Sequence, residues 1–233
     1  MNDQERSVLR WGGLAGILSS ITLILTSVTL FGFVPTAPTN PQALVERYPD
    51  VRLATLVGET FSFASAILFV AFLFAMYKAL RRTSPAPAAF GTGLGFLALA
   101  VLAVEGVPDV AYAKISDLYH APGATPQDQA TLALIWETTQ GLFSQYDTAS
   151  FILLGLAFIV LGLAMIRTST FGKSFGGISI FLGLAGLAGV YLLGITSNLF
   201  APLGLGVLII LPFLLGWKVY TLSKQVQEPG LSP

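Results

Sequence analysis

The chain has 233 residues, of which 54% are hydrophobic and 10% are charged, whereas a typical soluble domain carries about 25% charged residues. Its mean hydropathy of +0.76 leaves too little polar surface to cover a water-soluble globule, so lipid must solvate much of the chain. The 12 basic and 12 acidic residues cancel, which removes the clustered positive charge that binding of nucleic acid requires, and the absence of cysteine excludes disulfides and thiolate chemistry.

Long apolar runs predict an all-α fold with six membrane-spanning helices, in a single domain that covers residues 1–233. The first run is longer than the core of a signal peptide, which has about 7–15 residues, so we expect it to stay as a helix. Prolines and charged residues after it predict an extended, solvated loop at 35–52. The expected spans are residues 11–34, 53–80, 88–113, 145–167, 174–197 and 199–222.

The segment 128–167 contains nothing that breaks a helix, although it is about twice as long as a bilayer crossing requires. We therefore expect it to divide into an interfacial or re-entrant helix at 126–143 and the span at 145–167. Tryptophan commonly forms an aromatic belt at membrane interfaces. The tryptophans near the expected interfaces are Trp11, Trp136 and Trp217.

The basic residues fall mostly on one side of the expected bundle, which predicts its orientation. With the N-terminus in the cytoplasm, nine basic residues lie on the cytoplasmic side and three on the opposite side. Six spans return the C-terminus to the cytoplasm, so we expect a multi-pass protein of the inner (plasma) membrane. The nine are Arg6, Arg10, Lys78, Arg81, Arg82, Arg167, Lys173, Lys218 and Lys224, and the three are Arg47, Arg52 and Lys114.

The sequence matches itself without a gap at an offset of 85 residues. Arg82-Thr83-Ser84 aligns with Arg167-Thr168-Ser169, and Phe90-Gly91 aligns with Phe175-Gly176. Apolar helices of biased composition can match by chance, but these identities lie outside that bias. Because both copies cross the membrane in the same direction, we predict a parallel internal repeat with its axis along the membrane normal.

Acidic residues within the expected spans are the main candidates for function. A charged side chain at mid-helix costs roughly 2.5–3.5 kcal/mol on insertion scales. Basic residues lie only near the cytoplasmic ends of the expected spans, whereas several acidic residues lie toward their outer ends. Glu105, Asp109 and Tyr112 share a helical face through their i, i+4, i+7 spacing. The candidate ligand-binding residues are Glu59, Glu105, Asp109, Tyr112, Glu137 and Asp147.

Carboxylates that converge without a cationic partner cannot all stay ionised, so protons or a bound cation must neutralise some of them. Oxygen ligands suit Ca²⁺, Mg²⁺ or Mn²⁺, and a nearby histidine helps to bind a transition metal. Glu59, Glu105 and His120 are the candidate metal ligands, although a pocket for an organic cation or a lipid headgroup fits the pattern equally well. No motif names a catalytic residue or a cofactor.

Simpler roles compete with the functional one for several of these residues. Asp109 and Asp147 lie close enough to the expected interface to be solvated, and Glu137 fits the polar face of an interfacial helix. His120 stands in a polar stretch with proline and glycine, where loop residues are more common than ligands. A structural role explains Glu59 and Glu105 least well.

Short segments along the chain are shared with a known family. They are the opening at 10–16 (Arg-Trp-Gly-Gly-Leu-Ala-Gly), the basic end of the second span, Arg-Thr-Ser at 167–169 leading to Phe-Gly-Gly at 175–177, and the proline-containing last span at 202–217. Through these segments the chain resembles the bacterial six-helix membrane proteins of the DUF4386 family. The resemblance covers nearly the whole chain. The resemblance implies the architecture with six spans, and it brings neither an established activity nor catalytic residues.

Functions from three different classes are compatible with these observations. The first is a binding or transport protein whose outward-facing acidic pocket takes a cation, a proton or a small cationic or lipid ligand. The second is an intramembrane enzyme that modifies lipid with the same carboxylates. The third is an accessory subunit whose glycine-rich faces pack in a homo-oligomer or a larger membrane complex. Membrane lipid is an expected partner in each case.

Overall fold

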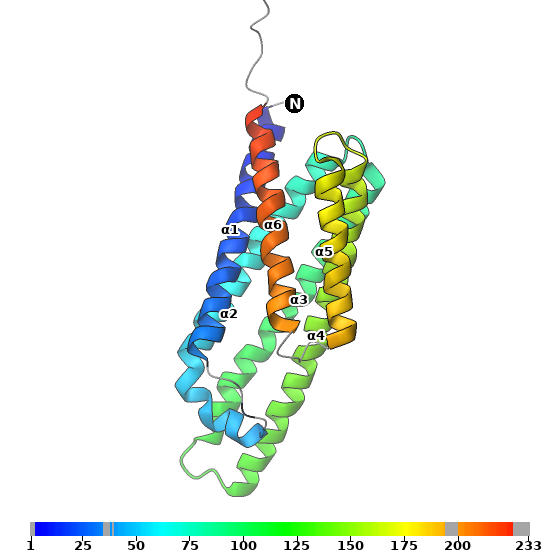
Figure 1. Cartoon of the computed structure of the whole chain (residues 1–233). Helices are drawn as coiled ribbons and strands as arrows, with labels where there is room; N and C mark the ends of the chain where they lie inside the picture. The colour runs from blue at the N-terminus through cyan, green and yellow to red at the C-terminus, as the bar shows by residue number, and fades with distance from the viewer. Residues whose placement is uncertain (1–2, 35–37, 39, 194–199, 226–233) are drawn as a thin grey trace, which may run out of the picture.

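A computed structural model describes residues 3–34, 38, 40–193 and 200–225, with the side chains of 105–110, 193, 200–203, 205 and 225 outside the description. The described residues form six helices and no strand. These are α1 (Asp3–Phe33), α2 (Pro41–Leu80), α3 (Pro85–Tyr119), α4 (Pro126–Ile166), α5 (Gly172–Leu193) and α6 (Phe200–Gln225), shown in Figure 1. All six are long and apolar enough to cross a membrane, which confirms the predicted all-α bundle with six spans.

The beginning of α1 and the end of α6 lie at the same end of the bundle, which we call the terminal end (Figure 1). The α2–α3 and α4–α5 connections lie there as well. A hydrogen bond ties them together, because Ser84 Oγ, just before α3, donates to the carbonyl oxygen of Ala164 near the end of α4 at 3.3 Å. We call the opposite end the distal end. This arrangement agrees with an even number of membrane crossings.

α4 is one continuous helix from Pro126 to Ile166, so the prediction of a separate interfacial helix at 126–143 is wrong. A capping box begins the helix, in which Thr125 Oγ1 accepts from the Asp128 amide and the Asp128 carboxylate accepts from the Thr125 amide at 3.0 Å. No proline follows Pro126 within the helix. The beginning of α4 also packs against α2 and α3, where Trp136 contacts the rings of Tyr48 and Tyr112, so the fall in hydropathy there does not end the helix.

The loop expected at 35–52 is also wrong from Pro41 onward, because α2 begins there. Asn40 caps this helix by accepting a hydrogen bond from the amide of Gln42 at 2.9 Å. Proline suits the first helical position, because an amide hydrogen there would have no partner within the helix. Pro49 lies inside α2 and is itself exposed.

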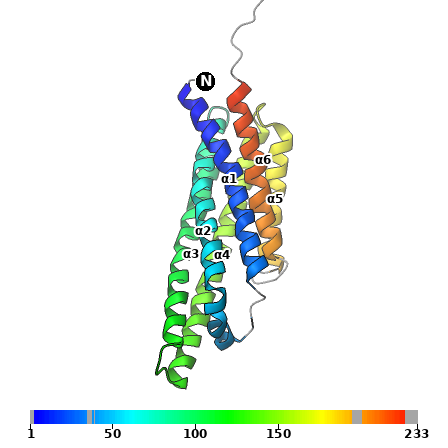
Figure 2. The ribbon, with the colours of Figure 1, turned by 90° about the vertical axis from the view of Figure 1, so that its left-hand side faces the viewer.

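α2, α3 and α4 extend past the other helices at the distal end (Figures 1 and 2). α2 has 40 residues and α4 has 41. At about 1.5 Å per residue each is about 60 Å long, twice the roughly 30 Å thickness of a hydrocarbon core. α3 likewise continues past its expected end at 113 to Tyr119. The far parts of these three helices therefore form an extension beyond the six-helix part of the bundle.

The extension has a small core of its own. Its buried members, which we call the distal cluster, are Val45, Tyr48, Tyr112, Ile115, Tyr119 and Trp136. Trp136 is 4% exposed, and its ring centroid lies 4.4 Å from that of Tyr112 and 5.2 Å from that of Tyr48. The predicted place of Trp136 in an aromatic belt is therefore wrong, whereas Trp11 and Trp217 are 68% and 57% exposed.

α1 packs against α2 on one side and α6 on the other through small residues and hydroxyl groups. The hydroxyls of Ser19 and Ser65 lie 2.8 Å apart between α1 and α2, and Ser20 donates to the carbonyl oxygen of Ile209 in α6 at 2.9 Å. Lipid tails are as apolar as the side chains, so close packing and hydrogen bonds hold helices together in a membrane. These contacts therefore fix α1 in the bundle.

The bounds of the long helices follow the offset of 85 residues. α2 begins at Pro41 and α4 at Pro126, and in both the side chain of the preceding residue caps the helix. The two helices end at Leu80 and Ile166, which differ from that offset by one residue. The bounds agree with the internal repeat, which stays a prediction.

Gly13→Leu should destabilise the protein, because α1 and α6 meet there backbone to backbone. A Cβ atom on Gly13 would lie 2.6 Å from the Tyr220 amide nitrogen and 2.8 Å from the Gly216 carbonyl oxygen. Overpacking of this kind costs about 1–3 kcal/mol, which lowers the melting temperature in lipid nanodiscs. Gly93→Leu is the matched control, because nothing lies within 4 Å of a Cβ at Gly93. Equal melting temperatures for the two variants would contradict this packing.

Quenching of tryptophan fluorescence tests the distal cluster. Three variants, each keeping one tryptophan and carrying Phe at the other two positions, are placed in bilayers of brominated phosphatidylcholine and titrated separately with acrylamide in water. Trp11 and Trp217 are exposed, so bromine should quench them, whereas the buried Trp136 should resist both quenchers. The burial of Trp136 is refuted if bromine quenches it as strongly as Trp217.

Candidate functional site

The acidic candidates on α2, α3 and α4 lie at one level of the bundle. Glu59 and Asp147 are half-buried and stand about 20 residues before the ends of α2 and α4. Glu105 stands about 20 residues after the beginning of α3. At about 1.5 Å per residue these positions are all about 30 Å from the terminal end, which equals the thickness of a hydrocarbon core. We call this the acidic level.

The two helices that carry Glu59 and Asp147 are held by contacts beside those residues. The carbonyl oxygen of Gly58 accepts a hydrogen bond from Thr26 Oγ1 of α1 at 3.3 Å, and a Cβ on Gly58 would lie 2.8 Å from Leu30 of the same helix. The backbone of α2 is therefore in close contact with α1 at the acidic level. On α4, Ser150 Oγ donates to the Asp147 carbonyl oxygen at 2.9 Å.

Glu105 and Asp109 lie in α3, but their side chains are outside the described residues. Their part in a ligand site, and the pairing of Glu105 with Glu59, stay predictions. α3 contacts both α2 and α4, so the backbone of Glu105 lies on a helix adjacent to those that carry the other two acids.

Tyr112 and Glu137 lie in the extension rather than at the acidic level. Tyr112 is 8% exposed and packs against Trp136 in the distal cluster. Glu137 follows Trp136 in α4 and is exposed. The structure therefore places these two candidates farther from the terminal end than Glu59 and Asp147.

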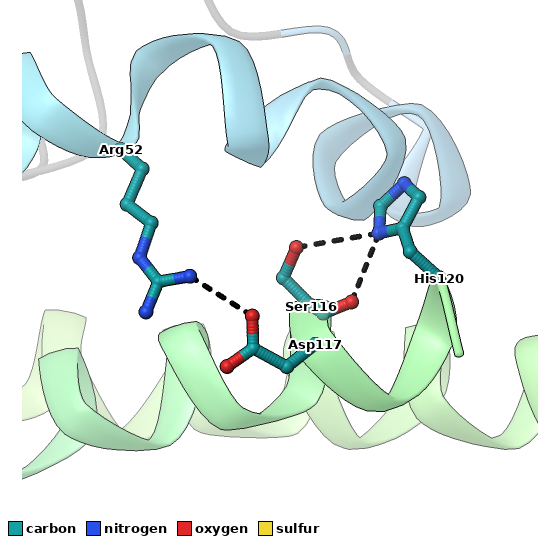
Figure 3. Close-up of polar contacts among 4 residues, drawn as sticks. All are labelled: Arg52, Ser116, Asp117 and His120. Carbon is teal, nitrogen blue, oxygen red and sulfur yellow. Dashed lines mark hydrogen bonds and ion pairs between the residues drawn. The ribbon is translucent and has the colours of Figure 1, made fainter. Parts of the chain in front are cut away.

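His120 is exposed and caps the end of α3. Its Nδ1 lies 2.9 Å from the carbonyl oxygen of Ser116 and 3.5 Å from the hydroxyl of the same residue (Figure 3). Among the residues that the structure describes, no three His, Asp or Glu side chains are grouped in a way that could hold a metal ion. Metal binding by Glu59 with Glu105 stays a prediction, because the side chain of Glu105 is outside the described residues.

Polar contacts at the surface of the extension join α2 to α3. Arg52 of α2 forms an ion pair with Asp117 of α3 at 2.9 Å (Figure 3), and both side chains are largely exposed. The hydroxyl of Tyr119 donates to Glu46 at 3.0 Å. Burial raises the pKa of Tyr119 above that of a free phenol, and the hydrogen bond to the negative Glu46 carboxylate raises it further. Tyr119 therefore remains a neutral hydrogen-bond donor at physiological pH.

The distal cluster was not expected from the sequence, although its members show a recognisable spacing. Tyr112 and Tyr119 are seven residues apart, and Val45 and Tyr48 are three apart, so each pair lies on one helical face. This signal becomes visible only if the polar segments that carry these residues are assigned to helices rather than loops.

Comparison with known proteins identifies the family but no characterised relative. The family model described as "Domain of unknown function (DUF4386)" matches residues 37–223, which cover most of the chain and include α2 to α5 entirely. No curated protein and no solved structure matches the chain. The resemblance noted in the sequence is thereby confirmed, and the chain belongs to the DUF4386 family.

Proposed function

We propose that this membrane protein binds a cation, or a small ligand with a cationic group, at the acidic level, through Glu59, Glu105 and Asp147 with Asp109 nearby. The observation that carries the proposal is the common level of the first three residues on adjacent helices, about 30 Å from the terminal end. Carboxylates near the edge of the hydrocarbon core can receive a ligand from the water on the distal side.

The charge distribution supports a cationic ligand. The sequence has no basic residue in α1 after Arg10, in α2 between Arg52 and Lys78, in α3 before Lys114, or in α4. Acidic groups that lie at one level of a helix bundle favour a bound proton or cation.

The distribution of basic residues supports an orientation with both termini in the cytoplasm. The nine basic residues of the expected cytoplasmic side stand at or near the terminal end, and the other three stand in the extension. Cytoplasmic segments are enriched in arginine and lysine. On this basis the terminal end faces the cytoplasm, the extension faces outward, and the acidic level opens to the exterior of the plasma membrane.

The arrangement favours binding or transport over lipid chemistry. The distal cluster gives the extension a core of its own, and α2, α3 and α4 run without a break from that core to the acidic level. These helices therefore form a fixed support around a ligand site. A cation that enters between these helices meets carboxylates that the helices hold in place. A reproducible binding geometry requires such rigid support.

Cation-dependent thermal stability tests the proposal. The wild-type protein and the variants Glu59→Gln, Glu105→Gln and Asp147→Asn are melted in phosphatidylcholine nanodiscs with Na⁺, Ca²⁺, Mn²⁺ or tetramethylammonium. N-methylglucamine at equal ionic strength provides the reference. We expect at least one cation to raise the melting temperature of the wild type, and each substitution to reduce that rise because it removes a ligand charge.

The same substitutions should stabilise the protein when no binding cation is present. Removing about 1 kcal/mol of repulsion between carboxylates corresponds to a melting temperature about 2–4 °C higher for a chain of this size. Glu137→Gln is the matched control, because Glu137 is exposed on α4 away from the acidic level, and it should leave both quantities unchanged. A wild type that responds to none of the cations, with variants that melt as it does, would refute the proposed site.

A further inference from the structure

A groove lies between the beginning of α3 and the end of α4, at the terminal end and far from the acidic level. Its volume is about 710 Å³, it is wide open to its surroundings, and almost all of its lining is apolar. Pro87, Ala89 and Phe90 line it from α3, and Val160, Leu163 and Arg167 line it from α4. None of these residues belongs to the proposed cation site.

The walls of the groove are exposed at the surface of the bundle. Phe90 is 64% exposed and Leu163 is 48% exposed. Both lie in helices that are apolar enough to cross a membrane, within about the first two turns of α3 and the last turn of α4. At that depth the surrounding solvent is lipid, so a flexible acyl chain is the occupant that matches an open apolar groove.

Arg167 provides the only charge among the groove residues, and it stands where α4 ends. Its side chain is exposed, and among the described residues no carboxylate pairs with it. The offset of 85 residues relates Arg167 to Arg82, whose guanidinium pairs with Glu5 at 2.6 Å. One arginine of this related pair is therefore neutralised within the chain, whereas the other remains available to an external anion.

The shape of the groove is set by contacts between its two helices. The hydrogen bond from Ser84 to Ala164 joins them at the terminal end. About two helical turns after Ser84, a Cβ on Gly91 would lie 2.8 Å from the side chain of Leu161, so the two helices are in close contact there. The groove is therefore present before a ligand arrives, and a ligand need not separate the helices.

We propose that this groove binds an anionic phospholipid from the leaflet at the terminal end. The phosphate group contacts Arg167, whose planar guanidinium donates two parallel hydrogen bonds to phosphate oxygens. One acyl chain lies along Phe90 and Leu163. The excess of basic over acidic residues at this end adds a broader attraction for negative headgroups, as basic pockets between membrane helices commonly show.

Lipid retention measures this site directly. The protein is reconstituted in nanodiscs of equal palmitoyl-oleoyl phosphatidylglycerol and phosphatidylcholine, and native mass spectrometry counts the lipids that remain bound. We expect phosphatidylglycerol to be retained over phosphatidylcholine. Arg167→Gln should lower that preference about fivefold, which corresponds to about 1 kcal/mol for one basic residue near the surface. Arg167→Lys should keep part of the preference, because it keeps the charge but loses the planar donor pair.

Two further variants separate this site from general electrostatic attraction. Arg10→Gln removes the same charge from an exposed residue of α1 at the terminal end and should leave the preference unchanged. Ala89→Trp fills the groove from its exposed side and should reduce retention of phosphatidylglycerol, while the melting temperature confirms that the variant is folded.

Three results would overturn the proposal. They are a wild type that retains both lipids equally, an Arg10→Gln variant that loses as much preference as Arg167→Gln, and a folded Ala89→Trp variant that retains phosphatidylglycerol as the wild type does.

Discussion

A backbone inside hydrocarbon must satisfy its own amide and carbonyl groups, and unbroken helices meet this requirement with bonds inside each segment. In this protein α2, α3 and α4 continue as unbroken helices past the length of a bilayer crossing and into the extension. A continuous helix fixes the height of every residue through its rise of about 1.5 Å. The level shared by Glu59, Glu105 and Asp147 is thus a consequence of helix continuity, as is the meeting of three helices in the distal cluster.

Close approach of backbones then decides how the helices stand beside one another. Gly13 brings α1 against α6, and the paired hydroxyls of Ser19 and Ser65 join α1 to α2. The contact continues to the acidic level, where Thr26 bonds to the carbonyl of Gly58 beside Glu59. The backbone beside Glu59 is therefore fixed against α1, and Glu59 itself is half-buried. Packing within the bundle therefore limits which neighbours can neutralise the carboxylate.

Hydropathy predicted the six crossings correctly, because a long apolar run has one stable arrangement in lipid. It placed the ends of the helices wrongly, because the polar turns at 41–52 and 126–143 are stabilised by caps and by partner helices rather than by hydrophobicity. The burial of Trp136 was hidden for a related reason, since its ring partners belong to α2 and α3 and lie far away in the sequence. The common height of the acidic level depends on the lengths of α2, α3 and α4, and hydropathy predicted the bounds of these helices wrongly.

The acidic level and the groove share two helices, α3 and α4, and lie about 30 Å apart along them. Charges this far apart interact weakly, because ions at the aqueous ends screen them over about 10 Å at 0.1 M salt. Mechanical connection is stronger, because Ser84 and Gly91 hold α3 against α4 beside the groove. Those contacts set the axial register of the two helices. The register determines how closely Glu105 and Asp147 match in their distance from the terminal end. The packing at the terminal end is thus part of what sets the heights of the residues at the acidic level.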